Sequence, residues 1–160
     1  NGVYTATDLN RVGTACLEVA KMLRDAVTDT QQYASDNEVG WDVIYDFPYD
    51  PDDYNITAKT NWFNETNTTT VSANNFPNKS KMDIYLNNVK LLRNAISSNY
   101  PSLPSNMSGL SYNSANNIER VIMLVYEALN KEMARIKSLI DQAAASSFYS
   151  AEVYSGEVEA

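Results

Sequence analysis

Residues 115–145 read ANNIERVIMLVYEALNKEMARIKSLIDQAAA, and their apolar side chains decide the fold. These side chains recur at alternating spacings of three and four, which places them on one face of a helix. The stripe comprises Ile118, Val121, Ile122, Val125, Leu129, Met133, Ile136, Ile140 and Ala143. A helix that begins after Ser111 or Asn113 and reaches Ala145 would be about 45 Å long. Because shorter helices of one subunit rarely cover so long a stripe, we expect part of it to contact another chain.

Two shorter helices are predicted upstream, at residues 7–29 and 81–98. Their apolar stripes have the same spacing and consist of Leu9, Val12, Cys16, Val19, Leu23 and Val27 in the first, and Met82, Tyr85, Val89, Leu92 and Ile96 in the second. Each begins at a capping box, formed by Thr5 with Asp8 and by Ser80 with Asp83. We expect both helices to pack against the N-terminal half of the long third helix.

The segment between these two helices, residues 30–79, has a different character. Apolar and polar residues alternate over 41–47 and again over 56–62, and a Pro- and Asp-rich turn separates the two runs. This pattern predicts a β-hairpin inserted between the helices. Residues 148–160 alternate weakly and are interpreted as a strand or tail. The expected fold is therefore mainly α, a single helical domain over 1–147 with three amphipathic helices and a hairpin insertion.

Composition narrows the classes of function. The net charge is −8, from 12 Lys and Arg against 20 Asp and Glu, which argues against binding nucleic acid through its phosphates. With no histidine and a single cysteine, Cys16, the chain has no imidazole base and no thiolate metal site. No apolar run approaches the length of a membrane-spanning helix, and no signal peptide is visible. Because a mature, trimmed chain would also lack a signal peptide, the cellular compartment stays open. We expect no catalytic residues, no cofactor and no membrane insertion.

Three local features leave alternatives open. Four Asp residues within 46–53 could bind calcium, although the spacing is not that of an EF-hand and a solvated turn is favoured. Aromatic residues of the insertion form either a small core or a surface that binds a glycan or a protein, and the candidates are Trp41, Tyr45, Tyr49 and Trp62. Glycosylation sequons are close to their chance number and weakly suggest a secreted helical module; they occur at Asn55, Asn64, Asn67, Asn78 and Asn106.

Several separated phrases resemble one protein family when they are taken together. They are YTATDLNRV at 4–12, TAKTNW at 57–62, MDIYLNNVK at 82–90, LPSNMSGL at 103–110, ANNIE at 115–119 and YSGEV at 154–158. In this order they resemble small proteins encoded in the tail-module region of phages and prophages of Gram-positive gut bacteria. The resemblance covers most of the chain, although the segment 30–54 departs from the shorter relatives. It implies a structural component of a tail, baseplate or fibre attachment, with no catalytic residues.

The sequence therefore predicts an assembly subunit of a phage tail or baseplate, located in the virion and assembled in the host bacterial cytoplasm. We expect it to form a homo-oligomer and to bind other virion tail proteins through its long helix and termini. The candidate oligomer interface consists of Val125, Leu129, Met133, Ile136, Ile140, Tyr154 and Val158. The alternative function is a host-surface or glycan-binding module that uses the aromatic and acidic hairpin.

Overall fold

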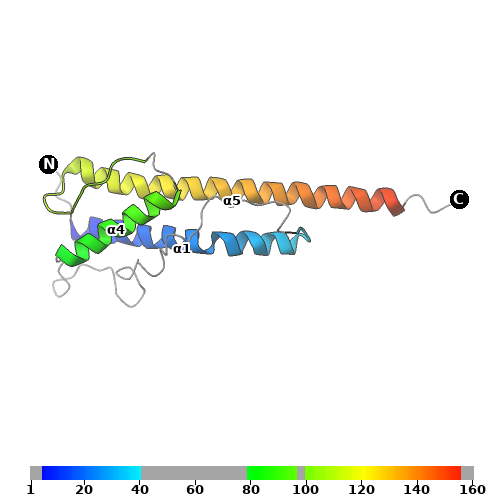
Figure 1. Ribbon diagram of the computed structural model, residues 1–160, viewed down its shortest axis with the longest axis horizontal. Helices are drawn as coiled ribbons and strands as arrows, with labels where there is room; N and C mark the ends of the chain where they lie inside the picture. Colours follow the sequence, from blue (N-terminus) through cyan, green and yellow to red (C-terminus); the bar gives the residue numbers. More distant parts are fainter. Residues whose placement is uncertain (1–4, 41–78, 97–99, 156–160) are drawn as a thin grey trace. The chain divides into compact units, whose positions relative to one another are not determined.

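The structure, a computed structural model, describes residues 5–40, 79–96 and 100–155 of the chain. Three helices occur in these ranges: α1 at Ala6–Asp36, α4 at Lys79–Ile96 and α5 at Tyr112–Ser155 (Figure 1). A mainly α fold with three helices, of which the last is the longest, is thus confirmed. Both α1 and α5 extend well beyond the ends that the apolar stripes predicted.

The β-hairpin prediction was wrong in so far as the structure bears on it. The described ranges contain helices and connecting loops and no strand, and residues 41–78, where the hairpin was placed, lie outside them. At the C-terminus, α5 continues to Ser155 through residues that we interpreted as the start of a strand or tail. The helix of this region is explained by its composition, since 143–145 are three alanines, the residue with the highest helix propensity.

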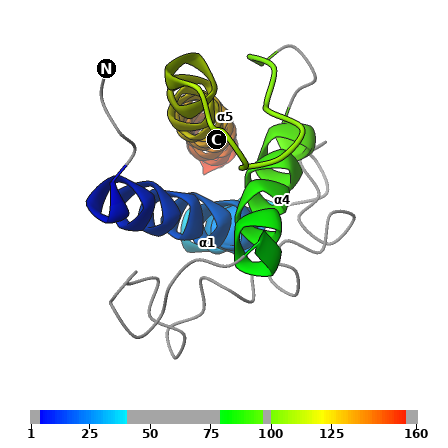
Figure 2. The ribbon, with the colours of Figure 1, turned by 90° about the vertical axis from the view of Figure 1, so that its left-hand side faces the viewer.

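The described residues belong to two compact units. Unit 1 contains α1 up to Arg24, all of α4, and α5 up to Leu129; unit 2 contains the remainder of α1 and of α5. In unit 1 the three helices surround a shared interior, with α4 on one side of the pair formed by α1 and α5 (Figure 2). The predicted packing of the two shorter helices against the first half of the long helix is therefore confirmed for this unit.

The interior of unit 1 is built from the predicted stripes. Its fully or nearly fully buried side chains are Val12, Cys16, Val19, Ala20 and Leu23 of α1, Tyr85, Leu86, Val89, Leu92 and Ala95 of α4, and Ala115, Ile118, Val121, Ile122, Val125 and Leu129 of α5. The α1 residues among them follow the 3,4 spacing of a heptad, the pattern of helices that pack along one seam.

The helices α1 and α5 run in the same direction (Figure 1), and a contact between them in each unit has the same residue separation. In unit 1 the guanidinium of Arg11 donates to Glu119, and in unit 2 the hydroxyl of Tyr33 donates to Asp141; each pair is separated by 108 residues. A parallel pair requires a long connection between its helices, and the segment between α1 and α5 that contains α4 supplies it. The constant register matches the heptad spacing of the α1 stripe.

Unit 2 has a much smaller interior than unit 1. Ala34, Ile136 and Ile140 are its fully buried cluster, against which Tyr33 and Val39 pack. The Lys137 ammonium lies 5.1 Å from the centre of the Tyr33 ring, and the hydrogen bond to Asp141 raises the pKa of the Tyr33 hydroxyl. The protonated Tyr33 hydroxyl therefore stabilises the folded state. This stabilisation is complete below pH 10 and is lost as the pH rises through the raised folded-state pKa of Tyr33.

One of the two predicted capping boxes is present at the helix starts, and α5 has a cap that was not predicted. The Asp8 N–H donates to Thr5 Oγ1 at 3.2 Å and the Thr5 N–H donates to Asp8 Oδ2 at 2.9 Å, which confirms the first capping box. The hydrogen bonds from Thr5 lower the pKa of the Asp8 carboxyl. The stability that the ionised Asp8 gives to the folded state is therefore lost only as the pH falls below 3.8 and through its lowered folded-state pKa. The Ser111 hydroxyl caps α5 by accepting from the Ser114 N–H at 3.1 Å. The second predicted box was wrong, because α4 already includes Ser80.

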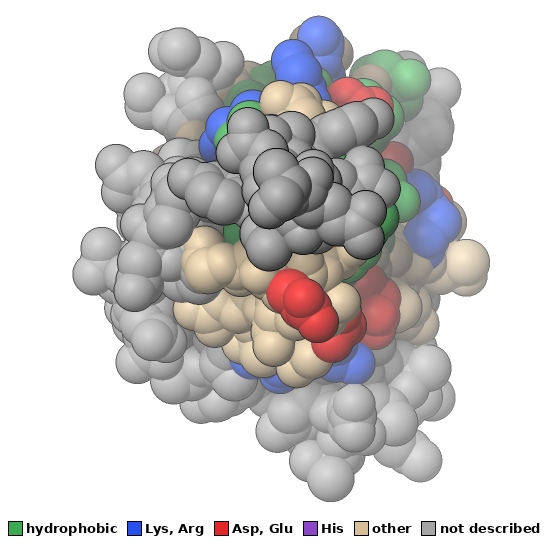
Figure 3. Space-filling model, turned by 90° about the vertical axis from the view of Figure 1, so that its right-hand side faces the viewer, with side chains coloured by type: hydrophobic (Ala, Val, Ile, Leu, Met, Phe, Trp, Pro, Cys, Tyr) green, Lys and Arg blue, Asp and Glu red, His purple; other side chains and the backbone are tan. Residues whose placement is uncertain are grey.

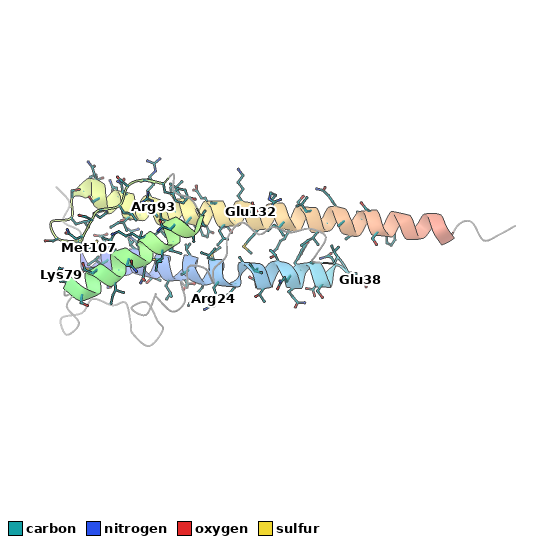
Figure 4. All side chains as sticks on the ribbon, viewed as in Figure 1. Arg24, Glu38, Lys79, Arg93, Met107 and Glu132 are labelled. Carbon is teal, nitrogen blue, oxygen red and sulfur yellow. The ribbon has the colours of Figure 1, made fainter. Side chains whose placement is uncertain are left out.

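The end of α1, where Figure 4 labels Glu38, forms a Schellman motif. The Val39 N–H donates to the Ala34 carbonyl at 2.9 Å, the Glu38 N–H donates to the Ser35 carbonyl at 3.1 Å, and Glu38 has a φ of 57°. Val39 then packs on the cluster that contains Ala34, the apolar contact typical of this motif. Glycine is the usual residue at the left-handed position, and Glu38 occupies it here at a conformational cost.

Replacing Glu38 with glycine is expected to stabilise the protein by about 1 kcal/mol, because glycine adopts the left-handed conformation without a Cβ clash. The measurement is the free energy of unfolding in urea. Glu38→Ala is the matched control, since it removes the same carboxylate while keeping the Cβ. Equal stabilities for the alanine and glycine variants would show that the backbone conformation at Glu38 carries no strain.

One polar side chain in the interior of unit 1 is not explained by the packing. Asn88 of α4 is fully buried, and its amide oxygen and nitrogen find no hydrogen-bond partner among the described residues. Thr30 of α1 is also fully buried, but its hydroxyl donates to the Ala26 carbonyl at 2.8 Å. An unpartnered buried amide costs about 1–3 kcal/mol, so Asn88 destabilises unit 1 as described.

Asn88→Leu is expected to raise the free energy of unfolding by about 1 kcal/mol or more, because a similar volume is kept while the desolvation cost is removed. Thermal and urea unfolding of the variant measure this. Asn87→Leu on the exposed neighbouring position is the control, and we expect no gain from it. A destabilised Asn88→Leu variant would mean that residues outside the described ranges supply a partner for the amide.

Candidate functional site

The candidate oligomer interface lies mostly inside the chain. Val125, Leu129, Ile136 and Ile140 are fully buried, and Met133 is half-buried. The Tyr154 side chain and Val158 lie outside the described part of the molecule. All four are covered within the chain: Val125 and Leu129 lie in the interior of unit 1, and Ile136 and Ile140 are covered because α1 is longer than its apolar stripe indicated. They could meet a second chain only if the helices separated.

The aromatic candidates for surface binding are not placed by the structure. Trp41, Tyr45, Tyr49 and Trp62 lie outside the described residues, as does the acidic turn at 46–53 that was considered for calcium. Among the described residues no group of three or more acidic or cysteine side chains is arranged to hold a metal ion. The structure does describe two other exposed surfaces, which lie on helices α1 and α5.

The first surface is a groove in unit 1 between α1 and α5, with a volume of about 760 Å³. Its lining comes from these two helices alone and comprises Arg11, Val12, Ala15, Glu18, Val19 and Met22 of α1 with Asn116, Glu119, Arg120, Ile122, Met123 and Tyr126 of α5. Met123 is 51% exposed and Tyr126 is 47% exposed, which is unusual for large apolar or aromatic side chains on one helix turn. We call this surface the α1–α5 groove.

Charged side chains line the rim of the α1–α5 groove. The Arg11 Nη2 lies 2.7 Å from Glu119 Oε1 and 3.8 Å from Asp8 Oδ1, which ties α1 to α5 at one end. Arg120 is exposed, and it forms no ion pair with any residue that the structure describes. The groove therefore has an apolar floor and an available cation at its edge. An amphipathic helix with few charges is the type of ligand that such a groove accepts.

The second surface is the last part of α5, residues 142–155, which we call the distal segment. Asp141 contacts Tyr33 near the end of α1, and α5 continues from there to Ser155 (Figure 1). Phe148 in this segment is 66% exposed. At 1.5 Å per residue the distal segment is about 21 Å long. An isolated helix of this length is only marginally stable in water, but the distal segment continues α5, whose preceding turns supply its nucleus.

Sequence reasoning identified α5 and placed Tyr154 of the distal segment in the candidate interface, but it missed the α1–α5 groove and the helix of the distal segment. Met123 and Tyr126 lie beside the stripe of buried residues and were not counted as part of it. A search for apolar residues flanking the stripe, rather than in it, could have found them. The helix of the distal segment was missed because its alanine and serine residues give no strong apolar period.

Comparison of the chain with models of protein families, with curated proteins and with solved structures gives no match. Within the described residues, no helix combines the length and the apolar character needed to cross a membrane.

The thiol of Cys16 is the one cysteine side chain of the sequence, and it lies fully buried in unit 1. Burial raises its pKa from 9.0 to about 12, which lowers the thiolate fraction at neutral pH about a thousandfold. We expect iodoacetamide to leave the folded protein unmodified and to label Cys16 fully in denaturant, as measured by intact mass. Rapid labelling of the folded protein would contradict the described packing of α1.

Proposed function

We propose that this chain is a structural subunit that assembles with further copies of itself through the distal segment of α5, as a component of a phage tail or baseplate. The observation that carries the proposal is the continuation of α5 beyond Asp141 to Ser155, with Phe148 exposed. A helix that extends past its intrachain partner and exposes an aromatic side chain is suited to contact another chain.

The composition of the distal segment supports contact between copies. Glu152 is its one charged residue, so copies can approach with little electrostatic repulsion. Small side chains at 143–147 allow helices to come close, and the exposed aromatic ring of Phe148 provides a large area for burial. In a virion, repetition of such a contact around an axis makes a modest interface sufficient.

Light scattering over a range of micromolar concentrations tests self-association. We expect a mass of several subunits that falls on dilution. A monomer of 17.9 kDa at every concentration would reject the proposal.

The assignment to a tail rests on the resemblance of the sequence phrases and needs its own experiment. Mass spectrometry of purified phage particles from a host that carries the coding sequence is expected to find the chain in stoichiometric amounts with other tail proteins. If the chain is missing from particles while it self-associates in solution, the virion assignment fails and the assembly proposal stands.

A further inference from the structure

We propose that the distal segment of one copy docks as a helix into the α1–α5 groove of a second copy. The inference rests on the proposed self-association and adds to it the surface that receives the distal segment. The contact joins two different surfaces and is therefore head-to-tail, so repetition produces a ring or an open filament.

The dimensions of the two surfaces match. The groove extends along α1 from Arg11 to Met22 and along α5 from Asn116 to Tyr126, about 16 Å on each helix. Three turns of a helix have the same length, and the distal segment, at about 21 Å, provides them with one turn to spare. Because the groove lies between two parallel helices and contains no residue of α4, a docked helix would complete a four-helix arrangement in unit 1.

The chemistry of the two surfaces is complementary. The groove presents Met22, Met123 and Tyr126 to an incoming apolar side chain, and Phe148 is the exposed aromatic residue of the described distal side chains. Methionine adapts its shape to an aromatic ring and makes favourable sulfur contacts with it. At the rim, Arg120 has no ion-pair partner among the described residues, and Glu152 is the one charge of the distal segment.

Charge also disfavours the competing arrangement, in which two distal segments pair in parallel and in register. That pairing would bring together the α1 ends of both copies, where Asp36 and Glu38 are exposed. Figure 3 views the molecule from its right-hand side in Figure 1 and shows acidic side chains in red among uncharged, tan surface. Like charges repel at short range, whereas the two glutamates that line the groove, Glu18 and Glu119, are balanced by Arg11 and Arg120, so docking there brings Glu152 to no net negative charge.

Two full-length variants test the inference. Phe148→Glu damages the distal segment and leaves the groove intact, and Met123→Glu damages the groove and leaves the distal segment intact. Both positions are exposed, so both variants should fold, and circular dichroism checks this. Ala134→Glu, an exposed position on α5 outside the groove, is the matched control and should assemble as the unaltered protein does. We expect each of the two variants to be monomeric by light scattering.

Mixing the two variants is the decisive step. Each mixed pair retains one intact groove and one intact distal segment, so we expect a 1:1 heterodimer that grows no further. If Met123→Glu assembles as the unaltered protein does, the groove is not the site at which copies dock. The groove is then filled by another protein or by the same chain, the inference fails, and the proposed function survives. If both variants are monomeric and mixing gives no heterodimer, a symmetric contact replaces the inference. If the unaltered protein is monomeric, both proposals fail.

A charge exchange provides independent support. Arg120→Glu and Glu152→Arg should each weaken assembly about tenfold, and the double variant, in which the pair is reversed, should recover most of this loss. Additive losses in the double variant would show that these two side chains do not meet and would overturn the proposed register.

Discussion

Replacing Ile136 with aspartate is expected to separate α1 from α5 throughout unit 2. Ile136 is fully buried and belongs to a cluster with only two other fully buried side chains, Ala34 and Ile140. Loss of a buried isoleucine costs about 2–5 kcal/mol, and an unpaired carboxylate in the same place adds several kcal/mol more. So small an interior cannot offset this cost. Amide hydrogen exchange should become fast in residues 25–36 and 130–141.

The exchange of unit 1 should change little, because Ile136 lies outside it. Ser138→Asp is the matched control: it adds the same charge to an exposed position of α5, and we expect native exchange in both units. Unchanged protection of residues 130–141 in the Ile136→Asp variant would contradict the packing described for unit 2.

Replacing Phe148 with glutamate is expected to weaken self-association at least about a hundredfold. Burial of a phenylalanine side chain contributes about 2–3 kcal/mol, and each 1.4 kcal/mol corresponds to a tenfold change in the dissociation constant. A glutamate at this position also has to be desolvated when the contact forms. Sedimentation equilibrium of the variant and the unaltered protein measures the ratio of their dissociation constants.

Folding of the monomer should not change, since Phe148 is 66% exposed. Ser146→Glu provides the control, because residues two apart on a helix lie on nearly opposite faces. This variant has the same added charge on the distal segment and should keep nearly full association. Equal effects of the two substitutions would point to general repulsion by charge rather than to a contact made by Phe148.

The helices could be predicted from the sequence because their buried residues keep a regular 3,4 spacing. Their ends could not be predicted for identifiable reasons. Residues 30–36 of α1 are mostly polar, and the left-handed residue that follows the helix end is Glu38, where glycine would have been a recognisable signal. The distal segment of α5 is helical through its alanines rather than through an apolar stripe.

The error in the ends of the helices also explains why Ile136 and Ile140 were assigned to a contact between chains. With α1 assumed to stop at residue 29, Ile136 and Ile140 had no partner within the chain and were assigned to a second one. The longer α1 covers both through Ala34 and Tyr33. The apolar surface available for assembly therefore lies further along α5 and in the α1–α5 groove. The exposure of side chains there depends on how the helices pack, so the periodicity of the sequence alone does not reveal it.

Hydrogen exchange of the distal segment at low and high protein concentration tests the central claim most directly. If copies associate through residues 142–155, amide protection there should rise with concentration, while that of residues 130–141 stays constant because α1 protects them at all concentrations. Protection of the distal segment that is the same at every concentration, in a protein that stays monomeric, would contradict the account.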